Sequence, residues 1–145
     1  MKHVSVLEAH QKQQDGHVYV DVRSTHEFEA GHPAGAVNVP LLEHDDTGQM
    51  AQNPDFLRVM KASFTPDTKI LVGCQAGMRS LKAAMMLETF GFIDVTNVKG
   101  GWGGARDQSG AFLEPGWVSA NLPAETDTPP DRTYEALLVK ADKAE

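Results

Sequence analysis

The only cysteine of the chain lies in a short loop between an apolar strand and an amphipathic helix, and this feature most limits how the chain can fold. The stretch ILVGCQAGMRSL covers residues 70–81, and its first four letters are typical of a strand. After the loop, Ala83, Leu87 and Phe90 recur at helical spacing, so a helix follows the strand directly. A strand joined to a helix in this way is half of a βαβ unit.

Strand and helix patterns alternate along most of the chain. Two capping boxes, Ser5-x-x-Glu8 and Ser24-x-x-Glu27, indicate the starts of helices. The expected helices cover roughly residues 5–14, 24–30, 53–64 and 80–90, with a short one after the glycine-rich junction at 100–104. The expected strands cover residues 17–22, 36–39, 69–73 and 95–98. This alternation predicts the α/β class with a mostly parallel sheet.

A length of 145 residues fits one domain. The composition changes near residue 120, where the stretch NLPAETDTPPDRT is rich in proline and poor in apolar residues. We therefore expect a folded domain over residues 1–119 and an extended tail over residues 120–145. A short helix from Tyr134 onward is expected to pack back weakly or not at all.

Charge and hydropathy exclude several classes of partner. A formal net charge of −7 argues against nucleic acid, which requires a basic surface. No stretch approaches the apolar length of a membrane span, so no membrane partner is expected. Residues 1–16 have no apolar run of signal-peptide length, and a secreted form would need a leader that has been removed. One cysteine allows no intrachain disulfide, so cytoplasmic localisation is the expectation.

Cys74 is the candidate nucleophile. It follows the carboxyl end of a strand, and open α/β sheets bind ligands at the carboxyl ends of their strands. It also precedes a helix whose first N–H groups lack backbone partners. Amides that converge on the sulfur would favour thiolate over thiol. Gly77 permits a positive φ, and Arg79 offers donors to an anion. The expected substrate-binding residues are Gln75, Ala76, Gly77, Met78, Arg79 and Ser80. The plainer alternative is a small buried cysteine beside a solvated arginine.

Three blocks of the chain resemble the single-domain rhodanese-like sulfurtransferase family. The first is the loop at residues 74–80, of the form Cys-x-x-Gly-x-Arg-Ser. The second begins with Asp21-Val22-Arg23, continues with Glu27-Phe28 and ends with GHPAGAVNVP at residues 31–40. The third is Gly100-Gly101-Trp102. Together the blocks span roughly residues 4–118, which is nearly everything except the tail.

The resemblance implies a fold and an activity. The fold is an open, mostly parallel five-stranded sheet with helices on both faces. In this family the cysteine thiolate takes a sulfane sulfur from a donor such as thiosulfate, becomes a persulfide, and passes the sulfur to cyanide or a thiol. No cofactor is implied. The expected partners are therefore a small-molecule sulfur donor and a thiol or cyanide acceptor, which could include a thiol protein.

Other polar residues of the second block have supporting roles in our interpretation. Asp21 follows a strand and is expected to fix neighbouring loops by hydrogen bonds. Arg23 is expected to pair with Glu27 or to line the rim of the cleft. His32 is expected to be a satisfied loop residue rather than a base. The histidines show no spacing typical of a metal site, so no metal is expected.

Alternative functions are separated by spacing and by charge. Cysteine phosphatases and arsenate reductases resemble Cys-x5-Arg, whereas four residues separate Cys74 from Arg79 here. A thioredoxin-like role would need a second cysteine. A partner-loaded sulfur carrier or a non-catalytic rhodanese-like binding module stays open. Because Gln75 and Ala76 are uncharged, Arg79 and Lys82 would have to attract a doubly anionic donor, and the identity of the donor is open as well.

Overall fold

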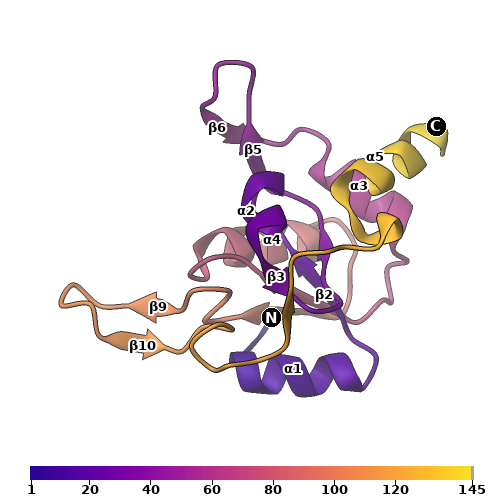
Figure 1. Ribbon diagram of the computed structural model, residues 1–145. Coiled ribbons are helices and arrows are strands. Elements are labelled where there is room, and N and C mark those ends of the chain that lie inside the picture. Colours follow the sequence, from indigo (N-terminus) through magenta and orange to yellow (C-terminus); the bar gives the residue numbers. More distant parts are fainter. Residues whose placement is uncertain (145) are drawn as a thin grey trace.

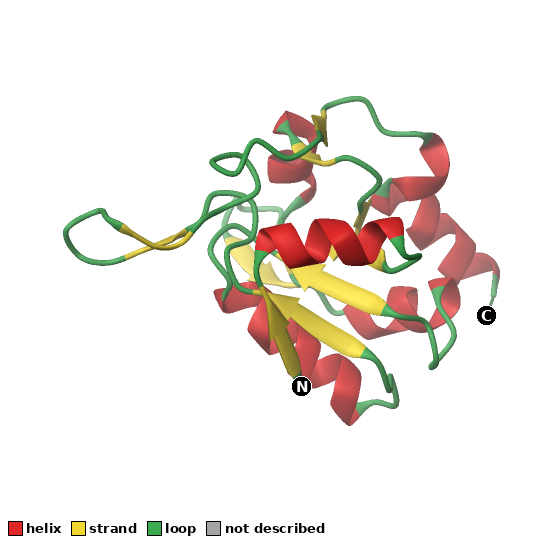
Figure 2. Cartoon of the chain, turned by 90° about the horizontal axis from the view of Figure 1, so that it is seen from below, coloured by secondary structure: helices red, strands yellow, loops and turns green. Residues whose placement is uncertain are grey.

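A computed structural model describes residues 1–144 and shows a parallel sheet of five strands. Every neighbouring pair of strands in this sheet is parallel (Figures 1 and 2). In spatial order, the strands are β1 (Lys2–Val4), β8 (Val95–Val98), β7 (Ile70–Gly73), β2 (Val18–Asp21) and β4 (Val37–Asn38). The α/β class and the five-stranded sheet that the resemblance implied are confirmed.

Helices cover both faces of the sheet, and strand β7 shows why. Its side chains alternate between the faces, so Ile70 and Val72 join one core cluster while Leu71 joins the other. The first cluster includes residues of α3 (Phe56–Ser63), α4 (Met78–Thr89) and α5 (Tyr134–Lys143). The second includes residues of α1 (Val6–Gln14) and α2 (Thr25–Ala30), together with Trp117. Strand β7 is therefore buried over its whole length.

Local sequence signals explain the starts of the first two helices. Both capping boxes form as predicted: the side chains of Ser5 and Ser24 accept hydrogen bonds from the amides of Glu8 and Glu27 at 3.2 Å each. Each glutamate carboxylate accepts a bond from the amide of its serine in return. The boxes satisfy N–H groups that a helix leaves without partners.

Helix α3 begins later than expected, at Phe56 rather than at Pro54, which would follow an N-cap at Asn53. The Asn53 amide group donates to the Pro40 carbonyl oxygen and to the Tyr134 hydroxyl, each at 2.9 Å. Its Oδ1 atom accepts a bond from the amide of Asp55. Asn53 therefore organises the turn before the helix and ties it to helix α5.

The expected short helix after residue 104 is wrong. This segment forms a hairpin of β9 (Ala105–Arg106) and β10 (Phe112–Glu114) that projects from the body of the protein (Figures 1 and 2). The Asp107 carboxylate accepts bonds from the amides of Ser109 and Ala111, which favours a turn over a helix. A second hairpin, β5 (Leu42–His44) with β6 (Met50–Gln52), was not predicted.

The expectation of a loosely held tail is wrong, although its C-terminal helix is present as α5. Strand β11 (Ala124–Glu125) pairs with β3 (His32–Pro33), and a 3-10 turn over Pro130–Arg132 leads into the helix. Leu137 and Ala141 of α5 are 7% and 1% exposed and belong to the core. Tyr134 and Leu138 pack against the same core cluster, so α5 docks through an apolar face that the overall composition of the tail does not predict.

No helix among residues 1–144 is long and apolar enough to span a membrane.

Candidate active site

Cys74 follows the carboxyl end of β7, near the middle of the sheet, and is 2% exposed. Three residues separate it from the first residue of α4. Its sulfur therefore lies where the strand ends and the amino end of the helix begins. We call residues 74–77 the cysteine loop.

The hydrogen bonds of the Cys74 sulfur come from the helix start. The Gly77 amide donates to Sγ at 3.1 Å, and Sγ lies 3.4 Å from the hydroxyl oxygen of the buried Ser80. In the described part of the chain, Gly77 is the one residue whose amide bonds this sulfur, whereas we expected several amides of residues 75–80 to converge on it. An amide donor and a helix amino end both stabilise negative charge on sulfur.

Gly77 is required by its backbone geometry. It has a φ of 106°, and a β-carbon at this position would lie 2.7 Å from the Lys99 carbonyl oxygen. Any other residue would be strained by this φ and would also clash with backbone. The glycine therefore allows the amide next to the sulfur to take its position.

The glycine-rich turn at residues 100–104 binds the backbone of the cysteine loop through hydrogen bonds. The amide of Trp102 donates to the Cys74 carbonyl oxygen at 2.7 Å, and the amide of Gly103 donates to that of Gln75 at 2.9 Å. A β-carbon on Gly101 would lie 2.2 Å from the Cys74 carbonyl oxygen. Glycine is thus needed for the close approach of two backbone segments.

Arg79 forms an ion pair with Glu27. Its guanidinium donates two hydrogen bonds to the Glu27 carboxylate, at 2.6 and 3.0 Å. The bond to Arg79 is the largest cause that lowers the pKa of Glu27 to about 2, and the same bond raises the pKa of Arg79. Glu27 also accepts hydrogen bonds from the amide and the hydroxyl of Ser24. Three groups therefore donate to this carboxylate: the Ser24 amide, the Ser24 hydroxyl and the Arg79 guanidinium.

Asp21 and Arg23 form a separate buried pair, and both side chains are 2% exposed. The Arg23 guanidinium donates to both oxygens of Asp21 and, at 2.7 Å, to the Gly31 carbonyl oxygen. Its carbon Cζ lies 5.1 Å from the centre of the Trp102 ring. The pairing of Arg23 with Glu27 that we considered is therefore wrong, since Arg23 binds Asp21 and connects the loops on either side.

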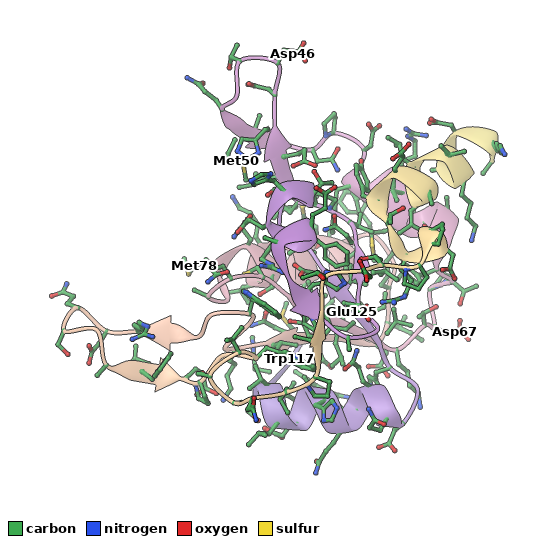
Figure 3. All side chains as sticks on the ribbon, in the orientation of Figure 1. Asp46, Met50, Asp67, Met78, Trp117 and Glu125 are labelled. Atoms are coloured by element: carbon green, nitrogen blue, oxygen red, sulfur yellow. The ribbon has the colours of Figure 1, made fainter. Side chains whose placement is uncertain are left out.

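The remaining predicted residues form the outer surface of the site. Gln75 and Ala76 are exposed. Met78, which is labelled in Figure 3, is 80% exposed. A hollow of about 430 Å³ lies beside the Arg79–Glu27 pair. The residues that line it are Ser24, His26, Glu27, Leu42, His44, Met50 and Arg79. Hairpin β5–β6 thus contributes to one wall of the hollow.

No group of three or more histidine, cysteine or acidic residues within residues 1–144 is arranged to hold a metal ion.

Comparison with known proteins identifies the family of the chain. Residues 5–107 match the family model described as rhodanese-like domain. The chain belongs to the rhodanese-like family. Among curated relatives, the chloroplastic thiosulfate sulfurtransferase 16 of Arabidopsis thaliana is 44% identical over 99 residues, which cover 68% of this chain and 82% of the relative.

Two further proteins show the spread of rhodanese-like relatives. The senescence-associated protein DIN1 of Raphanus sativus is 41% identical over 68% of this chain, which matches only 54% of that protein's length. The crystal structure of Rv0390 from M. tuberculosis has a TM-score of 0.72 and 25% identity, and the match covers 88% of this chain and 98% of that one. Proteins with different names are thus similar to this chain in sequence or in fold.

Three residues near the rhodanese-like loop were not predicted as part of the site. Ser80 donates to Asn97 Oδ1 at 2.7 Å, and Asn97 Nδ2 lies 3.3 Å from His3 Nδ1. Glu27 is the partner of Arg79. Asn97 could have been found as a buried amide at the end of strand β8, whereas the position of His3 depends on the unpredicted strand β1.

Proposed function

We propose that this rhodanese-like protein is a sulfurtransferase that carries sulfane sulfur as a persulfide on Cys74. The observation that supports this most is the sulfur at the end of β7, which accepts a bond from the Gly77 amide at the start of helix α4. This amide stabilises the thiolate, whose negative charge lies on Sγ, the atom to which the amide donates.

Transfer proceeds in two balanced displacements. The Cys74 thiolate attacks the outer sulfur of thiosulfate, the new S–S bond forms as the old one breaks, and sulfite leaves with the bonding pair. Cyanide or a thiolate then attacks the outer sulfur of the persulfide and regenerates the Cys74 thiolate. Each step is a thiol–disulfide type exchange, so ping-pong kinetics are expected.

Ser80 and the paired arginines have distinct roles in this proposal. The Ser80 hydroxyl oxygen, 3.4 Å from Sγ, accepts the hydrogen bond of the thiol and orients it, while the Ser80 hydroxyl donates to Asn97. Arg23, bound to Asp21, positions loops and does not touch the sulfur. Arg79 stays the proposed contact for the anionic group of the donor, with its charge balanced by Glu27.

Intact-mass measurement after incubation with excess thiosulfate tests the proposal. We expect the purified protein to gain the mass of one sulfur atom, to lose it when cyanide is added, and to release thiocyanate. The variant Cys74→Ser should gain nothing while keeping the circular dichroism spectrum of the wild type. Loading only by a cysteine desulfurase would indicate the partner-loaded carrier, and no loading by any donor would contradict the proposal. Cytoplasmic localisation stays a prediction from the sequence.

A further inference from the structure

The charges around Arg79 do not suit a doubly negative donor. Among the residues that line the hollow, Arg79 is the one arginine or lysine, and Glu27 binds it through two hydrogen bonds. The exposed His26 and His44 also line the hollow. The charges of Arg79 and Glu27 cancel, so the thiolate of the proposed reaction leaves one net negative charge. A dianion is therefore repelled twice as strongly as a monoanion.

Other cationic side chains do not offset this negative charge. Arg23 is buried in its pair with Asp21. Lys99 lies 3.8 Å from the Glu114 carboxylate on hairpin β9–β10. Lys82, which the sequence offered as a second anion contact, is exposed on α4 and does not line the hollow. The rest of the chain adds to the repulsion, because its formal net charge is −7.

The Glu27–Arg79 pair is also rigidly placed. Glu27 is the third residue of α2, where the capping box with Ser24 fixes its carboxylate. The two side chains are 31% and 21% exposed, so water screens them only in part. Arg79 would have to break a bidentate ion pair before it could bind a donor anion in the same way.

The outer surface of the site is apolar instead. Met78, which precedes Arg79 in the sequence, is 80% exposed. Met50 is 42% exposed and lines the hollow. Both methionines are labelled in Figure 3. Flexible, polarisable methionine side chains adapt to apolar groups of varied shape. An apolar group on the donor would therefore gain a contact that inorganic thiosulfate cannot make.

We propose that this site takes its sulfur from a singly charged donor with an apolar body, an organic persulfide or thiosulfonate, and that Glu27 sets this preference by neutralising Arg79. This proposal rests on the proposed function and names its substrate class. With a thiosulfonate, the Cys74 thiolate attacks the outer sulfur, an S–S bond forms, and a sulfinate leaves with the bonding pair. With a persulfide anion, the leaving group is a thiolate, and charge balances in both cases.

The test is the second-order rate constant for loading Cys74, measured by intact mass with thiosulfate and with benzenethiosulfonate. Glu27→Gln keeps the capping box, since glutamine also serves at that position, but removes the charge. We expect thiosulfate loading to rise about tenfold and benzenethiosulfonate loading about threefold, because the effect scales with donor charge. The gain with thiosulfate should shrink in high salt. Glu29→Gln removes the same charge from an exposed site on the same helix and should change neither rate.

A second pair of variants tests the apolar contact. Met78→Ala should slow benzenethiosulfonate loading about threefold through lost apolar contact and should slow thiosulfate loading by a clearly smaller factor. Met85→Ala, at a 56% exposed position of the same helix, is the matched control and should alter neither. Equal effects on the two donors, or none, in either Glu27→Gln or Met78→Ala would overturn this inference and leave the proposed function intact. Failure of both donors to load the wild-type protein would count against the proposed function itself.

Discussion

The hydroxyl of Ser80 lies 2.7 Å from Oδ1 of Asn97 and ties the first turn of α4 to the end of β8. Both side chains are buried. The same hydroxyl lies 3.4 Å from the Cys74 sulfur, so the group that contacts the thiol is itself held from the neighbouring strand. The position of the Ser80 hydroxyl is thus set by the contact between helix α4 and strand β8.

Ser80→Ala should impair both stability and transfer. Without the hydroxyl, Asn97 Oδ1 is left buried without this donor, so we expect the free energy of unfolding to fall by about 1–3 kcal/mol. Transfer of sulfur to cyanide should slow about tenfold, because the Cys74 thiol loses the hydroxyl oxygen that accepts its hydrogen bond and orients it. Urea denaturation and the kcat/KM for cyanide measure the two effects.

Ser63→Ala is the control for Ser80→Ala. The Ser63 hydroxyl oxygen is buried and has no hydrogen-bond partner in the described part of the chain. Its removal should leave stability unchanged or raise it, and activity should stay the same. If Ser80→Ala behaved like Ser63→Ala, the contact between Ser80 and Cys74 would have no functional meaning.

Gly77→Ala separates a backbone requirement of the site from ordinary backbone strain. Gly77 and Gly91 have nearly the same φ, 106° and 109°, but only at Gly77 does an added β-carbon meet backbone, at 2.7 Å from the Lys99 carbonyl oxygen. Either alanine should cost about 1–2 kcal/mol of stability from the positive φ alone.

Activity distinguishes the two glycine variants. Gly77→Ala has to move the amide that bonds the sulfur, so sulfur transfer should fall more than tenfold, the scale of losing one oxyanion-type donor. Gly91→Ala, at the far end of α4, should keep wild-type kcat/KM. Equal activity of the two variants would show that the Gly77 amide is dispensable. Thermal melts check that both remain folded at the assay temperature.

Local signals in the sequence predicted the centre of this protein better than its edges. The capping boxes at Ser5 and Ser24 and the loop around Cys74 depend on residues a few positions apart, and each lies where it was expected. Pairing between Glu27 and Arg79 joins residues 52 positions apart, and no local pattern encodes it. The docking of α5 depends in the same way on a surface that exists only once α3 has folded. Long-range partners were therefore missed in the site and in the fold alike.

The Glu27–Arg79 pair should make stability depend on acidic pH. The pKa of Glu27 is about 2 in the folded protein, against an ordinary value of 4.5. A carboxyl group with a lowered pKa stabilises the fold fully above pH 4.5, and this contribution is lost as the pH falls toward 2. We expect Glu27→Gln to cost about 1 kcal/mol at pH 7, as for a partly exposed ion pair, and less at pH 3. Urea denaturation at both pH values measures the difference, and a cost that did not shrink at pH 3 would argue against the ion pair.

The tail provides the last prediction, which follows from the docking of α5. Leu137 is 7% exposed within the core cluster that also holds Phe56 and Met60 of α3. Leu137→Ala should therefore lower the free energy of unfolding by about 2–4 kcal/mol, the cost of a cavity in a packed core. Val139→Ala, at a 47% exposed position of the same helix, should change it by less than about 0.5 kcal/mol.

Both tail variants are compared by urea denaturation and by sulfur loading of Cys74. Leu137 lies on α5, which packs against α3, so loading of Cys74 under native conditions should stay at the wild-type rate while stability falls. Removal of residues 120–145 should be far more damaging, because it takes away Leu137, Ala141 and the Pro123 carbonyl oxygen that binds the Trp117 indole at 2.7 Å. Wild-type stability of such a truncated chain would mean that the core forms without the tail. Helix α5 would then contribute nothing to the stability of the domain.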